Sequence, residues 1–176
     1  MIPIRNIYYM LSYAFQVLQE QGYKNIETEP FENVAELCAA ILAKGVALQL
    51  KRGLGRAYID QSEALSSLRG RIEISESIKT RSILKRQLVC SYDEFSENSY
   101  LNRIIKTTME LLLRADISKM RKKELRKLLV FFGGVDTLDV HTINWKVQYN
   151  RNNQTYRMLI SVCYLVIKGQ IGRAHV

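Results

Sequence analysis

Several patterns that mark catalytic or metal-binding proteins are missing from this sequence. Its 3 cysteines form no Cys-x-x-Cys pair, so neither a zinc site nor a disulfide framework is indicated. The two histidines, His141 and His175, are too few and too badly placed for a metal cluster. Glycine is never followed by lysine, and no Gly-x-Ser-x-Gly elbow occurs, which excludes the commonest phosphate loop and the nucleophile elbow. We therefore expect no metal and no cofactor bound by this chain.

A further missing pattern belongs to metal-dependent nucleases. Many of them hold Mg²⁺ on a carboxylate and use a lysine two residues later to polarise the attacking water. No Asp or Glu stands two residues before a Lys anywhere in the 176 residues. Asp93 and Glu94 are interpreted instead as caps of the following helix, because negative charge is favoured at a helix N-terminus. The sequence thus predicts no catalytic residues.

Positive charge is the main feature that is present. Lys and Arg number 26 against 17 Asp and Glu, a net charge of +9, which favours an anionic partner such as nucleic acid or an acidic protein surface. With 47% hydrophobic residues and 2 prolines the chain can bury a real core as one domain, or as one domain plus part of another. No apolar run reaches ~18 residues and no signal-peptide pattern appears, so we expect a cytoplasmic protein with buried, reduced thiols and no membrane contact.

Apolar residues at helical spacing cover most of the chain. They predict helices over 3–21, from Asn33 to about 50, after 98, after Ser118, and over 156–168. Residues 143–149 alternate between apolar and polar, which predicts a half-buried strand.

Residues 51–95 form the only long stretch without helical spacing. Nine Lys or Arg stand in it against four acids before Tyr92. Strands are predicted over 54–60, 68–74 and 87–92, and a short helix is compatible with 75–83. We therefore expect an α+β fold, with a mostly helical body and a projecting, β-hairpin-rich stem at about 51–95. Such a stem cannot bury both faces alone, which favours a partner; a small sheet lying on the helices is the alternative.

Two groups of basic residues are candidates for anion contacts. Arg69 and Arg71 project to one side of a strand over 68–74, where phosphate or carboxylate is the natural acceptor; a surface strand with salt bridges is the alternative. The second group shares one face of a helix opposite its leucines and is either an anion contact or a solvated face. Its members are Lys119, Lys122, Lys123 and Arg126.

Four segments together resemble a known family. They are IPIRNIYYMLSYAF at 2–15, LRGRIEISESIK at 68–79, the acidic run at 93–97 leading to LNRIIKTT at 101–108, and ISVCYLVI at 160–167. In this order, and reaching to about residue 170, they resemble McrC, the endonuclease subunit of McrBC modified-cytosine restriction systems.

The resemblance implies a two-part subunit. In the family, an N-terminal region docks on a hexameric AAA+ GTPase, McrB, threads a stem into its pore and stimulates GTP hydrolysis, while a C-terminal PD-(D/E)xK domain cuts DNA. Residues 1–170 would then be the partner-binding domain with the stem at about 51–95, and the nuclease domain with its Mg²⁺ would be absent. GTP would be bound by the partner, and DNA would be reached through the assembled complex.

From this resemblance and the stem interpretation we predict which residues contact the partner. They are Lys51, Arg52, Arg69, Arg71 and Glu73. Residues 171–176 (IGRAHV) depart from the family pattern and back-translate to a sequencing-adapter-like sequence, so we expect a non-native tail; a genuine variable end is the alternative.

The leading hypothesis is therefore a truncated McrC-like subunit that binds and stimulates a McrB-like GTPase ring. Whether the chain is itself an enzyme is left open, because the family is an endonuclease subunit and the nuclease motif is missing here. The alternatives are a basic DNA-binding module without catalytic activity and a stand-alone nuclease with an unrecognised site.

Overall fold

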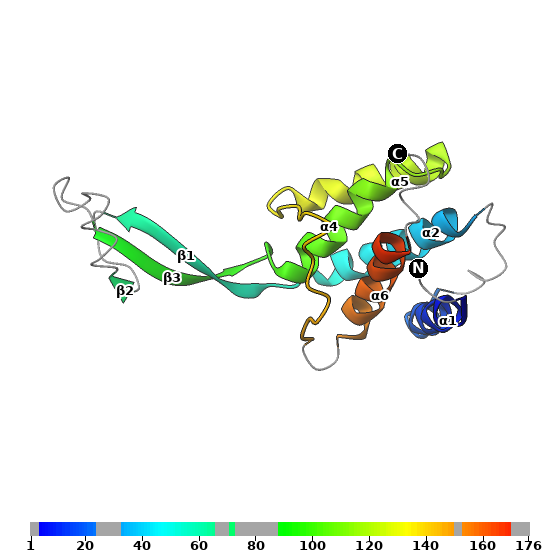
Figure 1. Ribbon diagram of the computed structural model, residues 1–176, viewed down its shortest axis with the longest axis horizontal. Helices are drawn as coiled ribbons and strands as arrows, with labels where there is room; N and C mark the ends of the chain where they lie inside the picture. The colour runs from blue at the N-terminus through cyan, green and yellow to red at the C-terminus, as the bar shows by residue number, and fades with distance from the viewer. Residues whose placement is uncertain (1–3, 24–32, 66–70, 73–87, 150–152, 170–176) are drawn as a thin grey trace. The chain divides into compact units, whose positions relative to one another are not determined.

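The structure is a computed structural model that describes residues 4–23, 33–65, 71–72, 88–149 and 153–169 (Figure 1). It divides into two compact units, which we call the helical unit (Met1–Leu54 with Tyr100–Val176) and the strand unit (Gly55–Ser99). The elements of the helical unit are α1 (Ile4–Glu20), α2 (Val34–Arg52), α4 (Tyr100–Leu112), α5 (Lys119–Leu129), the 3-10 helix η3 (Val130–Phe132) and α6 (Gln154–Lys168). Those of the strand unit are β1 (Ala57–Leu65), β2 (Arg71–Ile72) and β3 (Leu88–Ser96).

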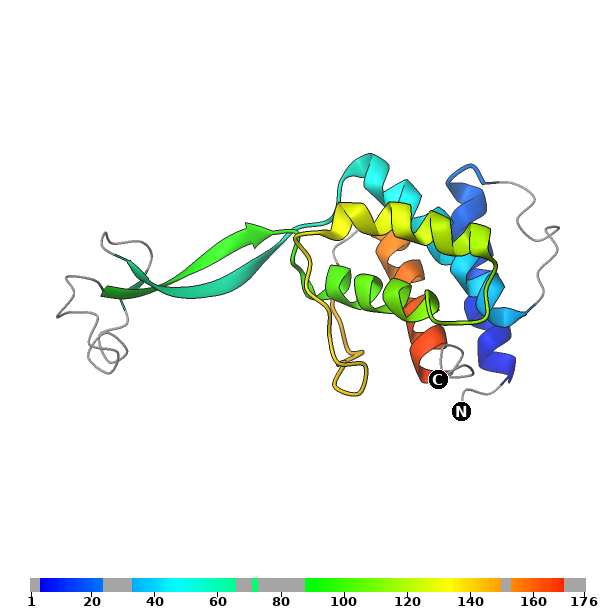
Figure 2. The ribbon, with the colours of Figure 1, turned by 90° about the horizontal axis from the view of Figure 1, so that it is seen from above.

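Helix α6 is the centre of the helical unit. It packs against α1, α2 and α4, and lies among them in both views (Figures 1 and 2). Ten of its 15 residues are buried and cover well over half of its circumference, as expected for a helix packed against several others. The other five are spaced three or four apart and form one less buried stripe. Its one large buried polar group is satisfied, because the Tyr156 hydroxyl donates a 2.7 Å hydrogen bond to Asn102 Oδ1 on α4. The predicted helix over 156–168 is confirmed.

Helix α2 runs the length predicted, including through its glycine. Asn33 caps it, with Oδ1 accepting a 2.8 Å hydrogen bond from the Glu36 N–H. Gly45 lies in its middle, facing α6. A Cβ there would stand 2.6 Å from Leu159 Cδ2 and 2.8 Å from Met158 Cε, so the glycine permits the close approach of the two helices. This contact outweighs the poor helix propensity of glycine.

The other predicted helices are confirmed with small changes in their bounds. Ile104, Ile105, Thr108 and Leu112 form the buried face of α4, while Leu101 is half-buried. Ser118 caps α5, where the Arg121 N–H donates to Ser118 Oγ over 3.1 Å. Among the described residues no helix combines the length and the apolar character that crossing a bilayer requires.

The strand unit is a three-stranded antiparallel sheet in the order β1-β3-β2. β1 and β3 pair from Ala57↔Ser96 to Leu65↔Leu88. β2 pairs its two residues with β3, Arg71 with Ser91 and Ile72 with Cys90. Asp93 and Glu94 therefore belong to a strand, and the prediction that they cap the next helix is wrong. The helix compatible with 75–83 and the tail at 171–176 lie outside the described residues.

The predicted fold class, α+β with a projecting β-hairpin-rich stem, is wrong. The fold is helical, because all the core residues whose side chains the structure describes lie in the helical unit, on its helices or on the segments that join them. The spacing of apolar residues in 51–95 indicates only the local backbone structure. The fold class depends instead on which elements share a hydrophobic core.

The strand predicted over 143–149 is also absent from the structure. Burial does alternate there: Ile143, Trp145, Val147 and Tyr149 are half-buried, and the residues between them are exposed. The half-buried side chains pack on the helices, with the Trp145 ring edge-on to Tyr164 at 5.2 Å. Side chains alternate between buried and exposed whenever one face of an extended segment packs on the protein. Such alternation does not require hydrogen bonding to another strand.

The two described free thiols are buried in the helical unit, as predicted. Burial raises the pKa of Cys38 to about 12, and burial likewise raises the pKa of Cys163 to about 12 against a weaker opposing effect of its hydrogen bond with Thr108. The thiolate is the reactive form, so both should be inert to thiol reagents near neutral pH. Cys90 lies on β3.

We expect Gly45→Val to lower the free energy of unfolding by about 1–3 kcal/mol, because Leu159 and Met158 must move to admit the side chain. Urea unfolding followed by circular dichroism measures the change. Ala47→Val, at a half-buried position of the same helix, controls for β-branching and should cost less. Equal costs for the two variants would contradict the close-packing interpretation of Gly45.

We expect unfolding stability to fall as pH rises above about 9, partly because of the two thiols. The thiol pKa is near 9 in the unfolded chain and about 12 in the folded protein. The contribution of each thiol to the free energy of unfolding is therefore complete below pH 9 and is lost as pH rises toward 12. The double variant Cys38→Ala/Cys163→Ala removes this contribution, so its stability should fall less steeply over the same range. Urea titrations at intervals from pH 8 to 11 compare the two slopes, and identical slopes would refute the assignment.

Candidate partner-binding site

The last turn of α2 carries two of the predicted partner contacts, Lys51 and Arg52, and both are exposed. Positive charge at a helix C-terminus is favoured by the helix dipole. Arg52 Nη2 donates a 2.7 Å hydrogen bond to Gln21 Oε1, and Gln21 Nε2 donates in turn to Thr155 Oγ1 over 3.3 Å. Arg52 therefore ties α2 to the ends of α1 and α6, whereas the Lys51 side chain makes no ion pair with any described residue.

Gly53 determines how the chain leaves α2. Its φ of 85° and ψ of 150° lie in a region that is nearly restricted to glycine. Its N–H donates to the Leu50 carbonyl over 3.1 Å, and its own carbonyl accepts a 2.9 Å hydrogen bond from Gln49 Nε2. These bonds hold the backbone beside Lys51 and Arg52 in one conformation.

The other three predicted contacts are in the strand unit. Arg71 lies on β2, where its backbone pairs with Ser91 of β3. Arg69 and Glu73 lie outside the described residues. The prediction that Arg69 and Arg71 project to the same side of a strand is therefore not tested. The structure thus shows Lys51 and Arg52 exposed in the same helical turn, and the grouping of all five remains a prediction.

Helix α5 is the most basic element of the helical unit. Six of its 11 residues are Lys or Arg, and none of its first-turn residues is acidic. Arg121 differs from the rest because it is mostly buried and bonded to two carboxylates, Glu124 at 2.7 Å and Glu36 at 3.5 Å. The remaining five make no ion pair with described residues. They are Lys119, Lys122, Lys123, Arg126 and Lys127.

Three exposed apolar residues, one at the start of α5 and two in η3, were not predicted from the sequence. Met120 is 81% exposed, Val130 is 76% exposed and Phe131 is 62% exposed. The chain tightens into a 3-10 helix after Leu129, which turns Phe132 into the core and leaves Val130 and Phe131 outside. The sequence signal was the run Val-Phe-Phe at the end of an amphipathic helix, and the change of helix type could not be read from it.

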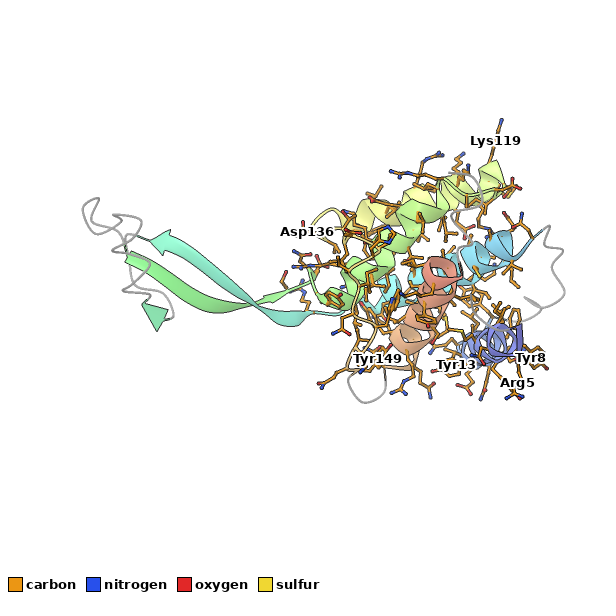
Figure 3. The ribbon with its side chains drawn as sticks, in the orientation of Figure 1. Arg5, Tyr8, Tyr13, Lys119, Asp136 and Tyr149 are labelled. Atoms are coloured by element: carbon orange, nitrogen blue, oxygen red, sulfur yellow. The ribbon has the colours of Figure 1, made fainter. Side chains whose placement is uncertain are left out.

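A second exposed apolar group lies on α1. Tyr8 and Tyr9 are both exposed, and their rings meet edge to face with centroids 5.8 Å apart. Figure 3 shows Tyr8 on α1. Tyr13 is half-buried on the same helix, and desolvation raises its pKa against the opposing charge of Arg157. Within the described part of the chain no group of three or more His, Cys, Asp or Glu is arranged to hold a metal ion.

Comparison with known proteins gives consistent matches. Residues 4–175 match the family model of the McrBC 5-methylcytosine restriction system component. The sequence is 32% identical over 172 residues to the type IV methyl-directed restriction enzyme EcoKMcrBC of Escherichia coli strain K12, covering 97% of this chain and 49% of that protein. The chain therefore spans about half the length of the curated relative it matches.

Two solved structures share the fold. One is the cryo-EM structure of the Thermococcus gammatolerans McrBC complex, with a TM-score of 0.63 and 22% identity over 93% of this chain and 50% of that chain. The other is a half-complex from a tetradecameric assembly of Thermococcus gammatolerans McrB AAA+ hexamers with bound McrC, with the same TM-score and identity and 40% of that chain covered. At this identity the likeness establishes the fold alone.

We expect Gly53→Ala to lower the free energy of unfolding by about 1–3 kcal/mol, because a Cβ is strained at this φ and ψ. The matched control is Gly134→Ala, at an exposed glycine with open space around it and no positive φ. Thermal unfolding of both variants tests the prediction. If Gly53→Ala were as stable as the control, the backbone beside Lys51 and Arg52 would not be held as described.

Proposed function

Because the chain belongs to the family of the McrBC 5-methylcytosine restriction system component, we propose that it binds a McrB-like AAA+ GTPase ring and stimulates GTP hydrolysis by that ring. The observation that carries the proposal is the family match over residues 4–175. The fold supports it, since one of the structures that shares it contains McrB hexamers with bound McrC.

We propose that residues 51–95 supply the contacts to the ring, as part of a partner-binding region spanning residues 1–170. Lys51 is the best placed of the described candidates, because its charge is exposed and unpaired among described residues. Arg52 has five N–H donors, so its single hydrogen bond to Gln21 leaves donors for a carboxylate or phosphate of the ring. Arg69, Arg71 and Glu73 complete the proposed set.

Stimulation of the ring implies a coupling that acts in both directions. If binding of this chain favours the hydrolysing state of the ring, then nucleotide that favours that state must tighten binding of this chain by the same factor. We propose that GTP is bound by the ring and that DNA is reached through the assembled complex. Mg²⁺ and DNA cleavage would belong to a nuclease domain outside these residues.

The test of the proposal is to mix the purified chain with a McrB-like AAA+ ring protein from the same source. Complex formation is measured by size-exclusion chromatography with light scattering, and GTP turnover by phosphate release. We expect a complex, a higher turnover rate, and tighter binding with a slowly hydrolysed GTP analogue than without nucleotide. No complex together with no change in turnover would refute the proposal.

The charge-reversal variant Lys51→Glu should weaken binding to the ring by about three- to tenfold, equivalent to ~0.7–1.4 kcal/mol. Lys168→Glu makes the same change at another exposed lysine in the last turn of a helix, α6, and should leave binding within about twofold. The two affinities are compared by titrating labelled ring protein. Equal losses in both variants would mean that overall charge, and not the position of Lys51, determines binding.

A further inference from the structure

From the arrangement of charge on α5 we propose a second binding surface, separate from the ring contact. We infer that the exposed face of α5 binds the phosphate backbone of duplex DNA without reading its sequence. We call this surface the α5 basic face and define it by the five cations of α5 that make no ion pair with described residues. They are Lys119, Lys122, Lys123, Arg126 and Lys127.

None of these five cations makes an ion pair with a described residue. The only acid on α5, Glu124, is bonded to Arg121, and Glu36 from α2 also faces Arg121. Both carboxylates are thus engaged by the one arginine that turns inward. Four of the five remaining cations are exposed, and Lys122 is half-buried. Lys119 extends away from the helices (Figure 3).

Helix α5 is held firmly at both ends. At its start the Ser118 N–H and hydroxyl donate to the two Glu36 oxygens, at 2.8 and 3.0 Å. After its end, Lys106 Nζ donates to the carbonyls of Phe132 and Val135, at 3.0 and 2.6 Å. Leu125 is fully buried beneath the helix. The cations are therefore presented on a fixed support, which lowers the entropic cost of binding.

The placement of the charges works against the stability of the helix itself. Lys119 and Lys122 stand in the first turn, where the helix dipole disfavours positive charge, and no acid in that turn offsets them. The Glu36 carboxylate of α2 lies at this end of the helix, but it is engaged by Ser118 and Arg121 and makes no ion pair with either lysine. Residues that violate a local rule often mark a functional surface. An anion lying across the face would relieve this repulsion.

Duplex DNA fits this surface better than an acidic protein or a membrane. Lysine is depleted in protein–protein interfaces, whereas protein–DNA interfaces are strongly positive and contact phosphates largely through Lys and Arg. A membrane-binding helix needs a continuous exposed apolar face. Here the apolar face of α5 packs on the core through Leu125, and exposed Met120 and Val130 stand about 15 Å apart along the helix with four of the five cations between them.

The experiment measures binding of the 176-residue chain alone to a fluorescent 20-base-pair duplex by anisotropy, from 50 to 200 mM KCl. We expect affinity to fall steeply with salt and to be equal for duplexes with and without methylated cytosine. Five phosphate contacts correspond to a slope of about −4.5 in log affinity against log salt. A flat salt dependence, or a clear preference for the methylated duplex, would overturn backbone binding.

Matched variants locate the surface. Lys123→Gln/Lys127→Gln removes two charges from the α5 basic face and should reduce the salt slope by about 1.8. Lys146→Gln/Lys168→Gln removes two exposed charges that also lack ion pairs with described residues, and should leave the slope unchanged. Equal effects of the two pairs would overturn the assignment to α5, because net charge alone would then explain binding.

Two competitors distinguish DNA from other anions. Vesicles of 30% phosphatidylserine in phosphatidylcholine, and polyglutamate at matched charge, should each displace the duplex much less than unlabelled duplex does. If the vesicles or polyglutamate displaced the labelled duplex as effectively as unlabelled duplex does, the proposal that the α5 basic face binds DNA would be overturned. Because no ring protein is present, failure here is distinguishable from failure of the proposed GTPase stimulation.

Discussion

The enclosure of α6 by α1, α2 and α4 is the contact on which the rest of the structure depends. A helix with so wide an apolar face is stable only when neighbouring helices cover most of its circumference. Gly45 lets α2 approach it closely, and Asn102 satisfies its buried tyrosine hydroxyl. The outer faces of the surrounding helices are consequently fixed in space, and these faces carry the charges on which our proposals rest.

Polar contacts between elements then decide which surface charges are available. Glu36 is bonded to Ser118 and faces Arg121, so it both anchors the start of α5 and engages one cation. Arg52 is engaged by Gln21 in a similar way at the end of α2, while Lys51 beside it is free of ion pairs with described residues. These contacts distinguish cations that are already engaged from cations that make no ion pair with described residues.

The fold class was the largest error of interpretation from sequence. Residues 57–96 do contain paired strands, but their pairing is local to the strand unit and none of them contributes to the described core. Residues 143–149 show the opposite case, in which burial alternates as in a strand without any strand pairing. Alternation reports that one face is packed, and strand pairing needs a partner that a local pattern does not reveal.

The sequence by itself determined the five helices, the Asn33 and Ser118 caps, the buried thiols and the family, because helical spacing, caps and motifs are local in the chain. It also pointed to Lys51, Arg52 and the basic face of α5 as candidates. Only the tertiary structure decided that Arg121 is engaged while Lys123 makes no ion pair with described residues, that Val130 and Phe131 face outward, and that Gly45 packs against Leu159 and Met158 of α6. Each of these depends on contacts between residues far apart in the chain, or on a change of helix type imposed by packing, and neither leaves a periodic signal in the sequence.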